Sequence, residues 1–320
     1  MKLLITGATG LIGREIVELS NQHGISVNYL TTQRAKIISN ENFQGFYWNP
    51  EINEIDHNAF EGVTAIINLA GSSISKRWTS EYKNEILSSR LNSLKTLNHA
   101  LGKIDTSKIT SFVSASAIGI YPNSLSSLYT EDEEGIDDGF LGEVVQKWEK
   151  EIDALKHFGF LVSKVRIGLV LSKDGGALPE LAKPIKSYLG ATLGNGKQWQ
   201  SWIHCSDLAR LLLFIVKNEL SGTYNAVSPN PITHEKMVKE IAKALNMPIF
   251  LPNIPRFMMQ LILGEMSYLL FASQRVSSKK IAKEGFVFEY PNIGNALQHF
   301  YNGVSVNDLQ NDLKTEDFQP

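Results

Sequence analysis

Cysteine is almost absent from this sequence, and the residue clusters that mark disulfide-stapled or metal-stabilised chains are absent too. Cys205 is the only cysteine among 320 residues, so no disulfide can form within the chain. No group of Cys and His residues has the spacing of a zinc site. We therefore expect a protein of a reducing compartment with no bound metal.

Long apolar runs are also lacking. Thr6 and Gly7 interrupt the first apolar run before it reaches the length of a signal peptide. The most apolar later stretch, "FMMQLILGEMSYLLFA", is broken by Gln260, Gly264 and Glu265, and it is too short and too polar to cross a bilayer. These features predict a cytoplasmic protein without a membrane partner.

Neither sign of charge is in clear excess. The chain has 31 Lys and Arg against 33 Asp and Glu, for a formal net charge of -2. A nucleic-acid partner is therefore not expected, because binding to phosphate backbones favours a surplus of basic residues. The 43% of apolar residues is enough to build a large core.

Short strand-like runs alternate with helical stretches through the first half of the sequence. This alternation predicts an α/β fold of the Rossmann type, in which a doubly wound parallel sheet is followed by a smaller C-terminal α/β lobe. The expected strands include "KLLIT", "VNYLTT", "GFYWN", "TAIINLA", "ITSFVSAS" and "LVSKVRIGLVL". We expect a nucleotide-binding domain over 1–170, completed by segments near 200–228, a second lobe over 171–297 and a polar tail over 298–320.

Glycine, by contrast, is placed regularly near the start, every third residue from Gly7 through Gly10 to Gly13. The glycines follow a predicted strand and open a predicted helix, which is the context in which they bind a dinucleotide. Gly7 permits a tight turn, Gly10 lets the backbone approach a pyrophosphate, and Gly13 allows close packing of the helix. The residues expected to bind the cofactor here are Gly7, Thr9, Gly10, Leu11, Ile12 and Gly13.

The residues after the second predicted strand indicate which dinucleotide is bound. NAD-binding proteins usually carry an acidic residue there for the ribose hydroxyl, whereas a cation accommodates the extra phosphate of NADP. The segment between Glu18 and Glu41 contains no acidic residue, and it contains two cations, Arg34 and Lys36, just after the strand. We therefore expect NADP(H) rather than NAD(H), with Arg34 on the phosphate; the alternative is that Arg34 is an ordinary surface cation.

The order of several motifs resembles that of the extended short-chain dehydrogenase/reductase superfamily. "TGATGLIG", "NLAG" at 68–71 and "SASA" at 114–117 occur in that order. More closely, "WNP", "RWT", "SSR", "SASAIGIY", "WIHCSD", "NAVSPNP" and "SQRV" resemble the epimerase family of the bacterial YfcH and human SDR39U1 type. The resemblance covers residues 1 to about 297. It implies an NADP(H)-binding domain, with the turn at Leu69, Ala70 and Gly71 beside the cofactor, and a small second domain.

The resemblance also exposes a gap in the catalytic residues. In the superfamily, a Ser polarises the substrate oxygen, and the Tyr and Lys of a Tyr-x-x-x-Lys motif exchange the proton. Ser116 matches the Ser, but Phe140 and Val144 stand where the Tyr and Lys belong. Arg90 stands where the superfamily helix often carries an Asn.

Three functions remain open at this point. The first is an NADP(H)-dependent oxidoreductase or epimerase in which Ser116 acts with a rearranged acid or base, drawn from Tyr121, Glu143, Lys83 or Lys147. The second is a non-catalytic protein that binds NADP(H) and senses redox state or regulates a partner. The third is a scaffold that has lost its cofactor, which the intact glycine motif disfavours.

Candidate substrate contacts come from two groups of residues. Gln198, Trp199 and Trp202 have side chains suited to line a substrate cleft, although packing between lobes explains the tryptophans equally well. Arg77, Lys83, Arg90 and Arg275 offer cations to an anionic substrate, with salt bridges as the alternative. By analogy with extended superfamily members, the substrate would be a nucleotide sugar or a carbonyl compound, and a homodimer is possible.

Overall fold

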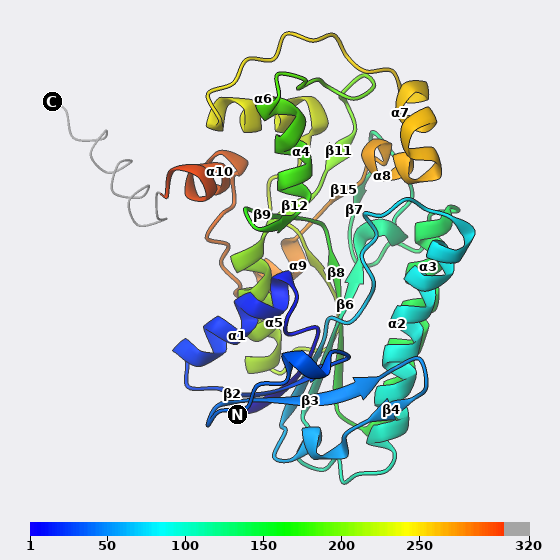
Figure 1. The fold of residues 1–320 in the computed structure, drawn as a ribbon, viewed down its shortest axis with the longest axis vertical. Helices are drawn as coiled ribbons and strands as arrows, with labels where there is room; N and C mark the ends of the chain where they lie inside the picture. The colour runs from blue at the N-terminus through cyan, green and yellow to red at the C-terminus, as the bar shows by residue number, and fades with distance from the viewer. Residues whose placement is uncertain (304–320) are drawn as a thin grey trace, which may run out of the picture. The chain divides into compact units, whose positions relative to one another are not determined.

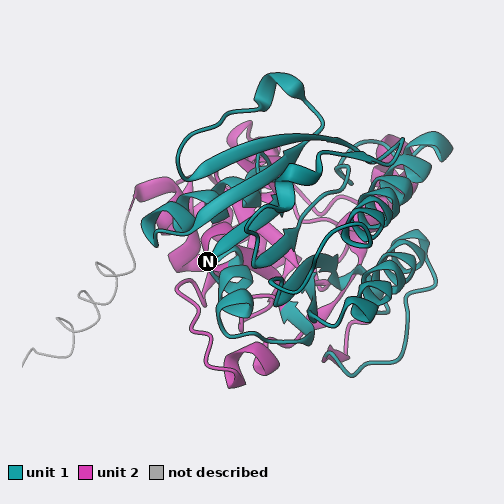
Figure 2. Ribbon diagram, turned by 90° about the horizontal axis from the view of Figure 1, so that it is seen from below, with its two compact units in different colours: residues 1–122, 131–167, 208–225 teal, residues 123–130, 168–207, 226–320 magenta. Residues whose placement is uncertain are grey.

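A computed structural model describes residues 1–303, which form two compact units (Figure 2). Unit 1 consists of residues 1–122, 131–167 and 208–225, and unit 2 takes the others, including 123–130, which the sequence analysis placed in the first domain. Helix α10 (Ile293–Asn302) continues beyond the expected start of the polar tail and buries Phe300, so 298–302 are helical. The remainder of that predicted tail, 304–320, lies outside the described residues.

Unit 1 is built on an eight-stranded sheet with the order β13-β8-β6-β5-β1-β2-β3-β4 (Figure 1). The pairings from β3 through β2, β1, β5 and β6 to β8 are all parallel, and β4 joins β3 antiparallel. The strand order reverses between β1 and β5, as in a doubly wound fold, so the predicted Rossmann-type fold is confirmed. The strands are β1 (Lys2–Thr6), β2 (Ser26–Thr31), β3 (Phe43–Asn49), β4 (Glu54–Ile55), β5 (Ala65–Asn68), β6 (Ser111–Ala117), β8 (Leu161–Ile167) and β13 (Gly222–Ala226).

Amphipathic helices cover both faces of this sheet. In Figure 1, α1 (Leu11–Gln22) and α5 (Cys205–Lys217) lie on one side, and α2 (Ser80–Leu101) and α3 (Phe140–Asp153) lie on the other. Helix α3 buries Val145, Trp148 and Ile152, which recur at helical spacing. A 3-10 turn follows and ends at Gly159, whose φ of 86° is the left-handed conformation that glycine adopts easily.

The chain leaves the large sheet at Gly168. The sequence predicted one strand through "LVSKVRIGLVL", but the structure has two, β8 and β9 (Leu169–Ser172), in different sheets. A Cβ atom at Gly168 would lie 2.4 Å from the carbonyl oxygen of Ser201, so only glycine fits at the crossing. Strand β9 pairs with β12 (Trp202–His204) and with β10 (Gly175–Gly176).

Unit 2 carries short strands and a set of small helices. Strand β11 (Trp199–Gln200) pairs with β14 (Ile232–Thr233), and β15 (Arg275–Val276) pairs with β7 (Leu128–Tyr129). Its helices include α4 (Ala177–Lys186), α6 (His234–Ala244), α7 (Arg256–Leu263), α8 (Tyr268–Phe271), α9 (Lys279–Lys283) and α10. None of the helices within residues 1–303 combines the length and the apolar character needed to cross a membrane.

Candidate functional site

The three early glycines form the turn between β1 and α1, and each has a different steric role. Gly7 has a φ of 72°, and a Cβ atom there would lie 3.2 Å from Leu69. At Gly13 a Cβ atom would lie 2.2 Å from the carbonyl oxygen of Gly7, so the helix packs too closely on the turn for any side chain. These two glycines are required by the fold itself.

Gly10 differs from Gly7 in its backbone conformation, because its φ of -81° is one that any residue can adopt. It is the N-cap residue of α1, and no side chain hydrogen-bonds to cap this helix. A Cβ atom at Gly10 would have one close neighbour, the Gly7 carbonyl oxygen at 3.1 Å. The first amides of α1, those of Leu11 and Ile12, therefore open onto a position that suits an anion such as a pyrophosphate.

A buried set of polar side chains fixes the neighbouring turn at Leu69–Gly71. The Thr6 hydroxyl accepts hydrogen bonds from the backbone N–H groups of Leu69 and Ala70, at 3.0 and 3.1 Å, and donates to Asn68 Oδ1 at 2.7 Å. Asn68 Nδ2 in turn donates to Ser114 Oγ at 3.0 Å. Thr6 and Asn68, the last residues of β1 and β5, are thus tied to Ser114 in the middle of β6. The carboxyl ends of such strands are where doubly wound folds bind their ligands. Sequence reasoning did not assign these three residues a role, although all three lie within the motifs that it used.

Arg34 begins a short 3-10 turn, Arg34–Lys36, just after β2. Its side chain is exposed, and its guanidinium carbon lies 3.7 Å from the centre of the Tyr47 ring. Stacking on an aromatic ring restricts the guanidinium while leaving its N–H edges open to an incoming anion. This placement supports the predicted contact with a 2′-phosphate, which stays a prediction.

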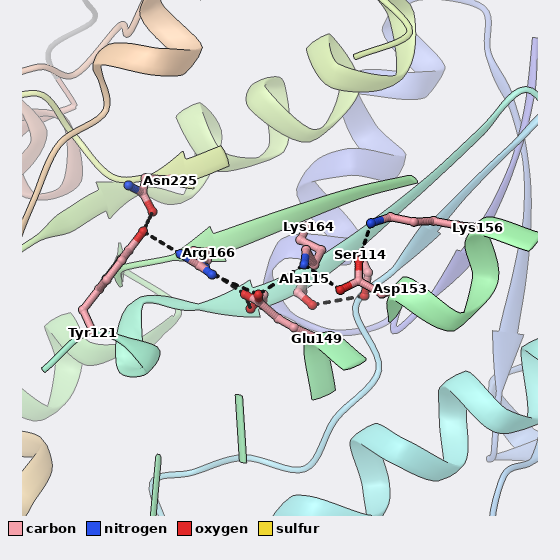
Figure 3. A network of polar contacts seen from close by, with 10 residues as sticks. Ser114, Ala115, Tyr121, Glu149, Asp153, Lys156, Lys164, Arg166 and Asn225 are labelled. Carbon is pink, nitrogen blue, oxygen red and sulfur yellow. Dashed lines mark hydrogen bonds and ion pairs between the residues drawn. The ribbon is translucent and has the colours of Figure 1, made fainter. Parts of the chain in front are cut away.

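Ser116, near the end of β6, belongs to a buried network that the sequence did not reveal. Figure 3 shows its other members Tyr121, Glu149, Arg166 and Asn225. Its hydroxyl donates to Glu149 Oε1 at 2.7 Å, and Arg166 donates to both oxygens of Glu149, at 2.8 and 3.0 Å. Arg166 Nη1 also donates to the Tyr121 hydroxyl at 3.0 Å, and that hydroxyl donates to Asn225 Oδ1 at 2.7 Å. The network joins β6, α3 and β8 to the residue after the 3-10 turn Ile118–Ile120 and to β13.

The ionisation of this network follows from its pairing. Burial opposes the charge of Glu149, but the hydrogen bonds and the charge of Arg166 outweigh burial and hold the pKa of Glu149 below its usual value. Burial likewise opposes the charge of Arg166, yet the contacts with Glu149 raise the pKa of the guanidinium. Burial raises the pKa of Tyr121 above its usual 10.0. At neutral pH the network therefore holds a carboxylate, a guanidinium and a neutral phenol.

The structure places the acid and base candidates from the sequence in different surroundings, and their roles stay predictions. Glu143 lies on the exposed face of α3, where it forms an ion pair with Lys147 at 2.6 Å. Tyr121 is fully buried and held by Arg166 and Asn225, and its raised pKa keeps the phenol protonated at neutral pH. The carboxylate that contacts Ser116 is instead Glu149.

The positions of the missing Tyr and Lys are filled by packing residues. Val144 is buried in α3, and Phe140 packs edge-to-face on Trp78, with ring centres 5.1 Å apart. Lys83 on α2 lies with its ammonium 5.1 Å from the Phe140 ring. Arg77 is exposed in the segment before α2.

Two of the three residues predicted to line a substrate cleft, Gln198 and Trp202, are buried in unit 2. Gln198 is buried and donates to the carbonyl oxygens of Leu193 and Leu270, each at 3.2 Å. Trp202 is fully buried and its indole donates to the Asn230 carbonyl oxygen at 3.1 Å, so it packs in the interior rather than lining a cleft. Trp199 remains partly exposed.

Trp199 is held from two sides within unit 2. Its indole N–H donates to the Leu125 carbonyl oxygen at 3.1 Å. The guanidinium of Arg275 lies 4.6 Å from the centre of its ring. Of the predicted cleft residues, Trp199 is thus the one whose surface a ligand can still reach.

Comparisons with known proteins agree with this architecture. The model of the NAD dependent epimerase/dehydratase family matches residues 3–139, and a domain of unknown function, DUF1731, matches residues 254–300. The chain is 35% identical over 302 residues to the epimerase family protein YfhF of Bacillus subtilis, which covers 93% of this chain and 97% of YfhF. The chain belongs to this epimerase family. A second family member, SAR0825 of Staphylococcus aureus strain MRSA252, is 36% identical over 296 residues, covering 92% of this chain and 97% of the relative.

Solved structures of epimerases have the same fold as this family member. The crystal structure of the human epimerase family protein SDR39U1 (isoform 2), determined with NADPH, matches with a TM-score of 0.81 and 26% identity over 95% of this chain and 100% of that one. A nucleoside-diphosphate sugar epimerase from Corynebacterium glutamicum matches with a TM-score of 0.77 and 26% identity, over 99% of this chain and 61% of that one. The resemblance seen in the sequence is thereby confirmed.

Proposed function

We propose that this epimerase family protein is an NADP(H)-dependent oxidoreductase or epimerase that acts on a small carbonyl compound or nucleotide sugar. The observation that carries the proposal is the open N-terminus of α1 at Gly10, where the strand order reverses. Gly7 and Gly13 build the turn, and the amides of Leu11 and Ile12 would bind the phosphates. When bound, the cofactor would supply or accept a hydride.

The preference for NADP(H) rests on Arg34. Its exposed guanidinium follows β2, the position from which doubly wound folds contact the adenine ribose, and no acidic residue lies between Glu18 and Glu41 to hold a ribose hydroxyl. The NADPH in the SDR39U1 structure, at 26% identity, supports the same preference.

In the buried network around Glu149, Ser116 would be the side chain that contacts the substrate. Its only proton is directed to Glu149, which leaves the oxygen lone pairs of Ser116 to accept a hydrogen bond. A substrate hydroxyl is the natural donor for such an acceptor. In this role Glu149 and Arg166 position Ser116 rather than exchange protons, because both are held in their charged forms.

The second candidate function is a non-catalytic NADP(H) sensor. It is favoured by Phe140 and Val144, which carry no exchangeable side-chain proton at the positions of the missing pair. A sensor would keep the glycine turn and Arg34, and it would turn over no substrate. The two functions thus share the cofactor site and differ in chemistry.

Calorimetric titration with NADPH and with NADH tests the cofactor assignment. We expect tighter binding of NADPH, and we expect Arg34→Ala to weaken NADPH about tenfold, a loss of about 1.4 kcal/mol, while NADH binding is unchanged. Lys103→Ala, an exposed cation between α2 and β6, is the matched control and should change neither affinity. Equal affinity for NADPH and NADH would contradict the preference for NADP(H). Equal effects of Arg34→Ala and Lys103→Ala would contradict the role of Arg34 in binding the 2′-phosphate.

Turnover then separates the enzyme from the sensor. Carbonyl compounds and nucleotide sugars are incubated with saturating NADPH or NADP⁺, with nicotinamide absorbance reporting net redox chemistry and chromatography reporting epimerisation. A reaction that Ser116→Ala slows supports the enzyme. Tight cofactor binding with no reaction in either assay supports the sensor instead.

A further inference from the structure

Arg90, on α2, is held in a fixed position beside the Leu69–Gly71 turn. Its Nη1 donates to the carbonyl oxygens of Ser72 and Ile86, at 3.2 and 2.8 Å. Its guanidinium carbon lies 5.0 Å from the centre of the Trp148 ring. A Cβ atom at Gly71 would lie 3.3 Å from Cγ and Cζ of Arg90, so the missing side chain at Gly71 makes room for this arginine.

The charge of Arg90 has no anionic partner in the part of the chain that the structure describes. Within residues 1–303 no carboxylate comes within ion-pair distance of its guanidinium, and its hydrogen bonds go to neutral carbonyl groups. Burial lowers the pKa of Arg90 to about 10, and the opposing interaction with Tyr82 offsets the desolvation of the cation only in part. Buried charges in proteins are usually paired, so a partly buried cation without a partner calls for an explanation.

Several N–H groups of Arg90 and Trp148 also have no hydrogen-bond acceptor among the described residues. Arg90 uses Nη1 for the two carbonyl groups, and its Nε and Nη2 donate to none of the described residues. The indole N–H of Trp148, below the guanidinium, is buried and has no hydrogen-bond partner among residues 1–303. Nε and Nη2 form the edge with which a guanidinium binds carboxylate or phosphate oxygens through two parallel hydrogen bonds.

We propose that Arg90 recognises an anionic group, a carboxylate or a phosphate, on the substrate of this protein. This inference rests on the proposed function and specifies its substrate class. The position of Arg90 favours a substrate over the cofactor's 2′-phosphate, because Arg34 follows β2 on one side of β1 whereas Arg90 borders the turn after β5 on the other. The pyrophosphate of the cofactor is the other source of anionic oxygens, and the experiment separates the two.

The first arm of the experiment measures anion binding directly. Inorganic phosphate and acetate are titrated into the full-length protein saturated with NADPH, and the ¹⁵N–¹H signal of Arg90 Nε is followed by NMR and assigned by its loss in Arg90→Lys. A saturable shift of this signal is expected. With Arg90→Met the affinity for phosphate, measured by calorimetry, should fall about tenfold or more.

Two variants control for indirect effects. Lys95→Met removes an exposed cation from the same helix and should leave phosphate affinity unchanged. Arg90→Lys keeps the charge but loses the paired N–H edge, so its phosphate affinity should lie between those of the wild type and Arg90→Met. Circular dichroism and thermal melting of each variant confirm that it is folded.

The second arm measures NADPH affinity in the same variants. We expect Arg90→Met to bind NADPH within about twofold of the wild type, a difference below about 0.5 kcal/mol. A loss of NADPH affinity as large as the loss of phosphate affinity would assign the guanidinium to the cofactor and overturn the substrate role. An Arg90 signal that does not respond to either anion, while NADPH still binds, would overturn the anion site and leave the cofactor proposal standing.

Discussion

Unit 1 contains a buried arginine, Arg166, that is paired with a carboxylate, and a partly buried arginine, Arg90, that is not. Arg166 donates to both oxygens of Glu149 and to Tyr121, and the contacts with Glu149 raise its pKa despite burial. Arg90 donates to backbone carbonyl groups alone, and burial lowers its pKa to about 10. A guanidinium whose donors are satisfied by the protein stabilises the fold, whereas one with open donors is available to a ligand.

Breaking the Arg166 pair should have the largest effect on stability. Glu149→Ala leaves a buried guanidinium without its carboxylate, and we expect the free energy of unfolding to fall by about 3 to 5 kcal/mol in urea denaturation. The double variant Glu149→Met with Arg166→Met should recover most of the loss, because it removes both charges.

The exposed pair on the same helix is the control for this prediction. Glu143→Ala breaks the ion pair with Lys147, which is open to solvent, and should cost at most about 0.5 kcal/mol. Equal losses for Glu149→Ala and Glu143→Ala would show that the buried network contributes no more than a surface pair.

Removing one hydroxyl from the network should have a smaller effect. Tyr121→Phe deletes the group that accepts from Arg166 and donates to Asn225, and we expect a loss of about 1 to 2 kcal/mol in unfolding free energy. The backbone N–H of Asn225 is separately held by Glu131 at 2.8 Å, so the local backbone should stay in place. A stability equal to that of the wild type would argue that the hydroxyl is not part of a coupled network.

The pH dependence of stability follows from Glu149. Its pKa in the folded protein lies below the usual 4.5, so the unfolded chain binds its proton more readily. The stabilisation from this carboxylate is present above pH 4.5 and is lost as the pH falls through the folded-state pKa. Urea denaturation of the wild type across this acidic range should show the decline, and Glu149→Gln should show a flatter profile. If stability declined with pH equally in the wild type and in Glu149→Gln, the pH dependence could not be assigned to Glu149.

Removing the unpaired arginine should affect stability less than breaking the Arg166 pair or removing the Tyr121 hydroxyl. Arg90→Met deletes a charge whose desolvation is only partly compensated, so the free energy of unfolding should change by about 1 kcal/mol or less. A loss as large as that expected for Glu149→Ala would mean that Arg90 is a structural residue like Arg166.

The sequence predicted the parts of this molecule that depend on local pattern. Alternating strands and helices predicted the doubly wound sheet, and the glycine spacing predicted a turn that the structure builds with Gly7 and Gly13 in positions no side chain fits. The apolar face of α3 followed from its helical spacing.

The sequence could not show what depends on tertiary contact. Glu149 sits among other charged residues in "QKWEKEID", and only its proximity to Ser116 and Arg166 distinguishes it from its exposed neighbour Glu143. The strand break at Gly168 was missed for a similar reason, because a continuous run of strand-forming residues does not reveal where a chain passes from one sheet to another. The sequence likewise does not show that Arg166 is paired with a carboxylate and Arg90 is not, because the pairing depends on which side chains the fold brings together.

The most direct measurement of the central claim is calorimetric titration of NADPH into Gly10→Val, with Gly10→Ala as an intermediate variant. Gly10 has an extended backbone, with φ of -81° and ψ of -178°, that other residues can adopt, so the fold should persist. The valine side chain would fill the space before the first amides of α1, and we expect NADPH affinity to fall about a hundredfold or more. NADPH affinity equal to that of the wild type in folded Gly10→Val would contradict the claim that the N-terminus of α1 holds the cofactor.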